Sequence, residues 1–413
     1  MATPNLKIIK TDGNLGRQAT TNDMVTGVVM NAVATPDMVL GEVYPITSLR
    51  AAEELGLSDQ YDNDNGVLVY HRIKRLFIHN PSIRVYFLPV AQDVTLLQMA
   101  TKESEYLAKL LRGRNGEIVQ AFIARNPDDD YVPTIEDGLN DEVMTAVYAA
   151  QDLAEYEFEK GRPVDLFVEG RNFTGTAAAV TDLKDLVTDC PDVSVVIMAD
   201  NDISISNPLF AKYAAVEDYV GLVSKAAVSQ NPGELIEDFN LTKPDRGVFV
   251  NPGLSSGNHI NTYTDADLEI LNEKGFVYAV NQGVPGCHIM DSNTCADETS
   301  DYSKLEANRS IKKAVKLIRE KLLPRVKGRV YVDPNTGKIA PADIKELEAI
   351  TETAMDPMVS ARDVSGRAGV DAYIDPDQNV LSTSKLEVEF TFVPVAIGRE
   401  ITLRIGFNNP LNK

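Results

Sequence analysis

An alternation of apolar strands and amphipathic helices in the middle of the chain constrains the fold most. Two continuous apolar runs, VDLFV at residues 164–168 and VSVVIMA at residues 193–199, have the composition of strands buried on both faces. Segments with helical spacing separate such runs between residues 84 and 228. Strands that alternate with helices are typical of a parallel sheet covered on both faces. We therefore predict an α/β fold in which this region has its own core.

The flanking regions mix short helices with strands and lack this regular alternation. They predict an α+β core with a mixed sheet, from which extended β arms project at both chain ends. The predicted segments are an N-terminal arm at 1–22, a core at 23–83 and 229–398, a peripheral parallel-sheet α/β domain at 84–228, and a C-terminal arm at 399–413.

The last residues alternate in hydrophobicity. The apolar positions are Ile401, Leu403, Ile405 and Phe407. Thr402 and Arg404 lie between them, and this period of two is typical of a half-buried strand. A strand close to a chain end presents unpaired N–H and C=O groups, so it can add to the sheet of a neighbouring molecule. The N-terminal arm contains a second short apolar stretch, formed by Leu6, Ile8 and Ile9.

The composition excludes several classes of partner. The 413 residues carry a formal net charge of −21, which argues against nucleic acid and anionic membranes. No apolar run has the length of a membrane span, and residues 1–10 lack the apolar core of a signal peptide. Three cysteines are too few for a disulfide framework. We expect a chain made in the cytoplasm, with no membrane insertion.

No motif in the sequence specifies an active site. The glycine-containing loop at 169–176 lacks the Lys-Ser/Thr pair of a P-loop, and Cys287, His288 and Cys295 match no zinc spacing. We therefore expect no catalytic residue, metal or cofactor. An α/β enzyme or small-molecule-binding protein stays open as an alternative, with its site near Gly170 and Asp200 at the carboxyl ends of the middle strands.

Basic residues concentrate between positions 309 and 329 of an otherwise acidic chain. Lys312, Lys316 and Arg319 lie on a segment with the periodicity of an amphipathic helix. Their charges fit either a solvated helix face or a surface that docks on an acidic partner. The segment at 354–369 is an alternative location for such a contact.

Several stretches together carry a resemblance to a known family. They are DGNLGR at 12–17 with the strand at 25–33, LNEKGF at 271–276 with 283–287, the helix at 301–323, and 393–395 with ITLRIGF at 401–407. In these stretches the chain resembles the contractile tail sheath proteins of phages and phage-derived injection machines. The resemblance covers residues 1–35 and 230–413.

The resemblance implies a structural subunit that polymerises as stacked hexameric rings around an inner tube. Neighbours would exchange their terminal arms, and contraction of the polymer would drive the tube through a target envelope. The implied partners are other copies of the chain, the tube protein, and baseplate and terminator proteins. Lys312, Lys316 and Arg319 would contact the tube. The implied location is a virion tail or phage-like particle assembled in the bacterial cytoplasm. A static capsid or baseplate component is a further alternative.

Overall fold

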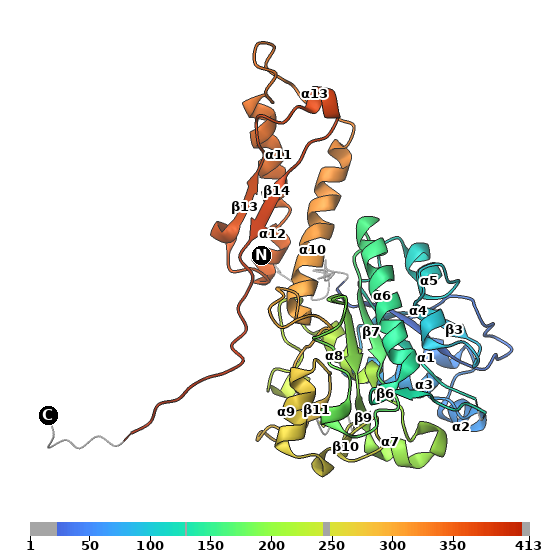
Figure 1. Cartoon of the computed structure of the whole chain (residues 1–413). Coiled ribbons are helices and arrows are strands. Elements are labelled where there is room, and N and C mark those ends of the chain that lie inside the picture. Colours follow the sequence, from blue (N-terminus) through green and yellow to red (C-terminus); the bar gives the residue numbers. More distant parts are fainter. Residues whose placement is uncertain (1–22, 129, 243–247, 407–413) are drawn as a thin grey trace, which may run out of the picture.

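A six-stranded sheet lies at the centre of the molecule (Figure 1). The computed structural model describes residues 23–128, 130–242 and 248–406. In spatial order the strands are β2 (Tyr44–Ile46), β3 (Arg84–Val90), β1 (Val25–Asn31), β4 (Gln120–Ala124), β7 (Asp165–Glu169) and β8 (Val193–Val196). All neighbours pair in parallel except β2, which is an antiparallel edge strand.

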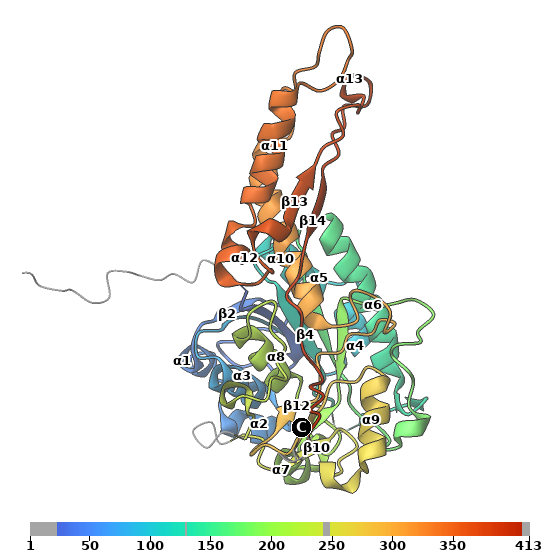
Figure 2. The ribbon, with the colours of Figure 1, turned by 90° about the vertical axis from the view of Figure 1, so that its left-hand side faces the viewer.

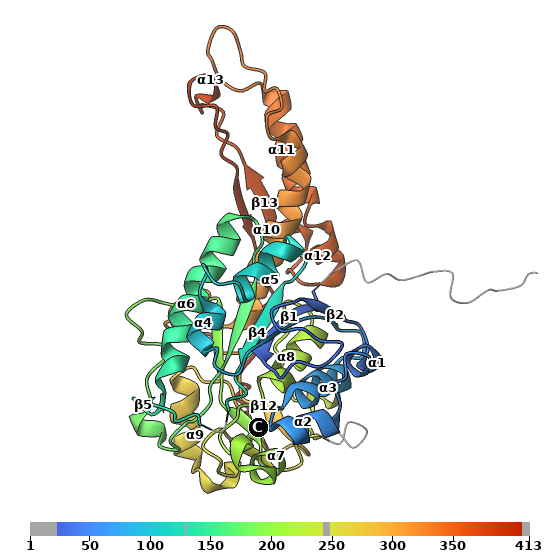
Figure 3. The same cartoon turned by 90° about the vertical axis from the view of Figure 1, so that its right-hand side faces the viewer.

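Helices cover both faces of this sheet, as Figure 3 shows from the side. One face packs against α8 (Val216–Lys225), which α3 (Val69–His79) contacts in turn, and the other against α4 (Leu96–Ala100), α5 (Leu107–Arg114) and α6 (Asp141–Glu159). Helix α6 begins at the N-cap Asn140, and two acidic residues in its first turn favour the positive end of the helix dipole. The predicted α/β fold is confirmed.

Smaller elements complete the body of the molecule. They are α1 (Leu49–Glu53), α2 (Asp59–Asn65), α7 (Asn201–Ser206), α9 (Asp265–Glu273), and the strand pairs β5 (Ile135–Glu136) with β6 (Leu139–Asn140), β9 (Met198–Asp200) with β10 (Pro252–Leu254), and β11 (Ala279–Val280) with β12 (His288–Ile289). Val277 pairs in parallel with Val196 at the end of β8, so the chain after residue 248 packs directly against the sheet. None of the described helices is both long and apolar enough to cross a bilayer.

A distal lobe, residues 323–392, projects from the body (Figures 1 and 2). Helix α10 (Leu305–Leu322) leads into it, followed by α11 (Pro341–Thr353), α12 (Asp356–Ala361), β13 (Val370–Tyr373), α13 (Val380–Thr383) and β14 (Glu389–Phe392). The apolar residues of the lobe form two small clusters. One surrounds Met355 and Met358 and also includes Val228 of the body and Ala314 of α10, and the other surrounds Ile339 and Ile374. Both clusters are distinct from the main core of the body, but the first joins the lobe to the body through Val228.

The structure corrects the predicted domain boundaries. Strand β1 lies between β3 and β4, so the central sheet crosses the boundary expected at 83/84. One apolar cluster extends from Val25 to Leu305 and also crosses the boundary expected at 228/229. Hydrophobic patterns identify buried strands but do not specify which strands pair. A peripheral position of residues 84–228 within a polymer stays a prediction.

Deletion of residues 84–228 should therefore prevent folding. Strand β1 would lose both of its parallel neighbours, and an exposed apolar strand does not form a stable fold by itself. We expect no cooperative thermal transition by circular dichroism and an insoluble product. A chain that ends at Arg399 is the control, and should melt like the full chain. A cooperative transition in the deletion variant would contradict this assignment of one shared core.

Candidate assembly site at the C-terminal arm

The chain after β14 forms an exposed C-terminal arm. It runs down beside the body and then extends away from it (Figures 1 and 2). Ile401, Leu403 and Ile405 are 90%, 80% and 90% exposed, and residues 400–406 belong to no strand of the described chain. The predicted strand is thus not formed within one chain. Burying each of these side chains would contribute about 1.5–3 kcal/mol, so the arm has the character of an unfilled contact surface.

The sequence also predicts arm residues at both ends of the chain. Leu6, Ile8 and Ile9 in the N-terminal arm, and Phe407 in the C-terminal arm, lie outside the described residues. Pairing between arms of different subunits therefore stays a prediction.

A two-stranded sheet in the distal lobe has the geometry of an acceptor for such arms. Strand β13 pairs in antiparallel register with β14, from Val370 opposite Phe392 to Tyr373 opposite Glu389. Within the described chain neither strand has a second partner strand, so both outer edges are open. Open edges with unpaired backbone groups can recruit strands from other molecules.

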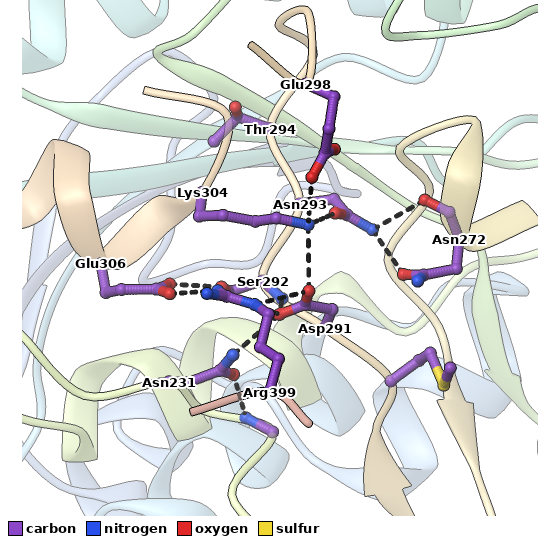
Figure 4. A network of polar contacts seen from close by, with 12 residues as sticks. Asn231, Asn272, Asp291, Ser292, Asn293, Thr294, Glu298, Lys304, Glu306 and Arg399 are labelled. Atoms are coloured by element: carbon purple, nitrogen blue, oxygen red, sulfur yellow. Dashed lines mark hydrogen bonds and ion pairs between the residues drawn. The ribbon is translucent and has the colours of Figure 1, made fainter. Parts of the chain in front are cut away.

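The root of the arm is fixed to the body by Arg399 (Figure 4). Its Nε donates hydrogen bonds to Oδ2 of Asp291 at 2.9 Å and to Oδ1 at 3.2 Å. Its Nη2 forms an ion pair with Glu306 in the first turn of α10. One guanidinium therefore joins two carboxylates that come from different elements of the body.

Further polar groups hold these carboxylates in place. Asn231 donates to Oδ1 of Asp291 at 2.8 Å, and the ammonium of Lys304 donates to Oδ2 at 3.0 Å. The hydroxyl of Ser292 donates to Glu306. Burial alone would raise the pKa of Asp291, but Lys304 and Arg399 outweigh it and hold this pKa at about 2. Because the pKa is depressed, the contact is fully charged above about pH 4 and weakens as the pH falls toward 2.

Comparison with models of known protein families identifies the family of this chain. The model of the DUF2586 N-terminal domain matches residues 3–293, and that of the DUF2586 C-terminal domain matches residues 301–412. The chain belongs to the DUF2586 family. No curated protein matches it in sequence. The border between the two family domains falls just before α10, close to the junction of body and distal lobe.

Solved structures of contractile injection systems share the fold of this DUF2586 protein. A chain in the contracted helical sheath of the anti-feeding prophage matches with a TM-score of 0.63 at 14% identity, covering 99% of this chain and 100% of that one. A chain of the anti-feeding prophage baseplate structure matches with a TM-score of 0.61 at 15% identity, covering 99% of this chain and 100% of that one. A chain of the contracted PVC sheath complex, from an extracellular contractile injection system, matches with a TM-score of 0.61 at 11% identity. The match covers 100% of this chain and 99% of that one. The chain thus has the fold of contractile sheath proteins over its whole length.

The first three cations of the basic segment of this DUF2586 protein, Arg309, Lys312 and Lys313, lie inside the molecule. The Lys312 ammonium is buried, where it pairs with Asp165 at 2.6 Å and Asp192 at 2.5 Å. Burial opposes its charge, but the two carboxylates outweigh this and raise its pKa. Lys313 is likewise buried, between Asp23 and Asp363. The prediction that Lys312 is available to a partner is therefore wrong, because helical periodicity does not reveal which charged face is buried.

The other two predicted contact residues differ from Lys312. Lys316 is half-buried and donates to the carbonyl of Gly116 at 2.8 Å, whereas Arg319 is exposed. A contact of Lys316 and Arg319 with another protein stays a prediction.

The alternative site near Gly170 and Asp200 is filled by packing and ion pairs. A Cβ at Gly170 would stand 2.7 Å from Cγ2 of Ile197, so this turn has no spare room. The Asp200 carboxylate pairs with Arg75. At the end of β7, the buried carboxylate of Glu169 pairs with Arg72 at 2.6 Å. These groups stabilise the interior of the body. A groove of about 1070 Å³ lies away from Gly170 and Asp200, in the distal lobe between residues 322–332 and 380–388.

The cysteines and the histidine considered as metal ligands do not form a metal site in the described part of the chain. Cys287, His288 and Cys295 are buried, and the part of the chain that the structure describes contains no cluster of three or more His, Cys, Asp or Glu side chains suited to a metal ion. Burial raises the pKa of Cys190 to about 12, which keeps this thiol protonated and unreactive.

The Arg399 contact was not predicted from the sequence. Its only local signal is a single cation beside Gly398, where the alternating arm begins. Its partners Asp291 and Glu306 lie 108 and 93 positions earlier in the chain. Only the fold brings these three side chains together.

Lys312→Met should destabilise the protein strongly, because it leaves Asp165 and Asp192 in the interior without their cation. We expect the free energy of unfolding to fall by about 3–5 kcal/mol in chemical denaturation. Lys321→Met, at an exposed position of the same helix, is the matched control and should change it by no more than about 0.5 kcal/mol. Equal effects of the two substitutions would contradict the structural role of Lys312.

Proposed function

We propose that this DUF2586 protein is the sheath subunit of a contractile injection particle, either a virion tail or a phage-like particle. It would be assembled in the bacterial cytoplasm as stacked hexameric rings around an inner tube. The proposal is supported by the fold it shares along its whole length with chains of contractile sheaths. Baseplate and terminator proteins would bound the polymer at its two ends.

The observation that carries this proposal is the combination of an exposed arm with an open sheet. Ile401, Leu403 and Ile405 are almost fully exposed, and among the described residues the sheet of β13 and β14 has no third strand at either edge. A C-terminal arm from one neighbour and an N-terminal arm from another would supply two strands for these edges. Each subunit would then be linked through backbone hydrogen bonds to several others.

Contraction follows from such links if the arms act as hinges. The subunits would move as rigid bodies while the exchanged strands keep them connected. The extended lattice would be metastable, and the compact lattice would bury more surface between subunits. The free energy difference between the two lattices would drive the tube forward, with no nucleotide consumed at firing.

In this proposal, the exposed cations near the C-terminal end of α10 contact the inner tube. Arg319 and Lys321 are exposed there, and Lys316 flanks them on the side of the body. Exposed ion pairs contribute about 0–1 kcal/mol each, which suits a contact that must release on firing. Charge complementarity would still fix the register between sheath and tube.

A static baseplate component is a second candidate, because one similar chain comes from a baseplate structure. Such a component would form a closed ring of fixed size. Electron microscopy separates the two: a sheath subunit forms tubes of variable length in an extended and a contracted form.

The arm face can be tested with two matched double variants. Leu403→Asp with Ile405→Asp places two charges on the apolar face, and should abolish tubes in negative-stain images while the subunit stays folded. Thr402→Asp with Gly406→Asp adds the same charge to the opposite face, and should leave tubes largely intact because only one face of an added strand is buried. Tubes formed equally by both variants would rule out the exchanged strand.

The tube contact can be tested by reversing exposed charges. Arg319→Glu with Lys321→Glu should reduce co-sedimentation of sheath with purified tube by roughly tenfold, since two favourable pairs become repulsive. Sheath-only polymers should still form. Lys345→Glu is the control, because this exposed lysine lies on α11 and not on α10. Normal loading of the double variant would place the tube contact elsewhere, with residues 354–369 as the next segment to test.

A further inference from the structure

A short strap is the second chain connection between the distal lobe and the body, after α10. The strap, residues 393–399, begins in the lobe, where the amide of Val393 donates to the carbonyl of Gly369 at 2.9 Å. Val393 also accepts from the amide of Ser365 at 3.0 Å. The strap ends on the body, where Arg399 contacts Asp291 and Glu306 (Figure 4).

The socket that receives Arg399 is charge-balanced only when the arginine is present. Its two carboxylates are nearly inaccessible, with 9% of the Asp291 side chain and 7% of the Glu306 side chain exposed. Lys304 supplies one cation and Arg399 the second. Removing the guanidinium would leave two buried carboxylates with a single cation, which is unfavourable. The planar guanidinium pairs with both carboxylates at once, through Nε to Asp291 and through Nη2 to Glu306.

We propose that Arg399 is a latch that fixes the root of the C-terminal arm, so that the arm pivots after residue 399. With the latch closed, a pull on the arm acts on the lobe and the body together. This inference rests on the proposed function, because only an arm bound to a neighbour is pulled. Within an isolated chain, the latch defines where the ordered strap ends and the free arm begins.

Opening the latch would lengthen the free arm. Residues 395–399 would join it, and five extended residues add about 17 Å of reach. A longer and looser connection fixes the position of a neighbour less well. The latch therefore sets the spacing between connected subunits, and its loss should produce tubes of irregular pitch.

Trypsin reports directly on the latch in unassembled full-length protein. The protease must insert the arginine side chain into its own pocket, so cleavage after Arg399 requires the latch to open first. Arg404, which is exposed in the same arm, provides an internal reference. Glu306→Gln and Asp291→Asn keep the arginine and the shape of the socket but remove one charge each. We expect cleavage after Arg399 in either variant to be roughly tenfold faster than in the wild type, relative to Arg404.

Two controls make this result specific. Glu298→Gln removes an exposed carboxylate 3.9 Å from Lys304 that does not contact Arg399, and should leave the rate unchanged. Circular dichroism establishes that each variant is folded. If the wild type is cut after Arg399 as fast as the two socket variants, the latch is wrong, whatever the chain assembles into.

Imaging then separates the latch from the proposed function. Wild-type tubes of regular pitch together with irregular tubes of Glu306→Gln would support both. Regular tubes of Glu306→Gln would overturn the role of the latch in spacing. Absence of wild-type tubes, with tube protein present, would overturn the sheath assignment while the trypsin result stood by itself.

Discussion

The ion pairs of Lys312 with Asp165 and Asp192 fix the distal lobe relative to the body. Lys312 lies on α10, whereas Asp165 begins the buried strand β7 and Asp192 directly precedes β8. A buried charge is stable only when it is paired, so this helix has one favourable position against the sheet. These ion pairs hold the N-terminal half of α10 against the body, and thereby fix the position of the lobe that carries the sheet of β13 and β14.

Two chain connections of different strength join the lobe to the body, and lobe and body also meet directly where the Ser229 hydroxyl donates to Asp363. The base of α10 is buried and held by several cations, including Lys312 and Lys313. The strap at 393–399 is thinner, and the Arg399 side chain at its end is 37% exposed. Partly exposed contacts open more readily than buried ones. A conformational change driven through the arm would therefore affect the strap before it affects α10.

The fold class followed from the sequence because local pattern and fold agree in the central sheet. The runs at 164–168 and 193–199 are mostly apolar, and the structure buries them, chiefly as the parallel strands β7 and β8. The alternation at 401–405 identified apolar side chains that need a partner, and they are exposed in the single chain. In both cases side-chain periodicity depends only on neighbours in sequence.

The predicted domain boundaries and the predicted role of Lys312 were wrong because both depend on residues far away in the chain. The sequence by itself determined that buried strands alternate with helices in the middle of the chain, and that residues 401–405 carry apolar side chains at alternate positions. Only the tertiary structure decided that β1 lies between β3 and β4, that Lys312 is buried, and that Arg399 meets Asp291 and Glu306. The physical reason is that strand pairing and charge pairing join residues far apart in the chain, whose proximity is a consequence of folding and leaves no trace in local periodicity.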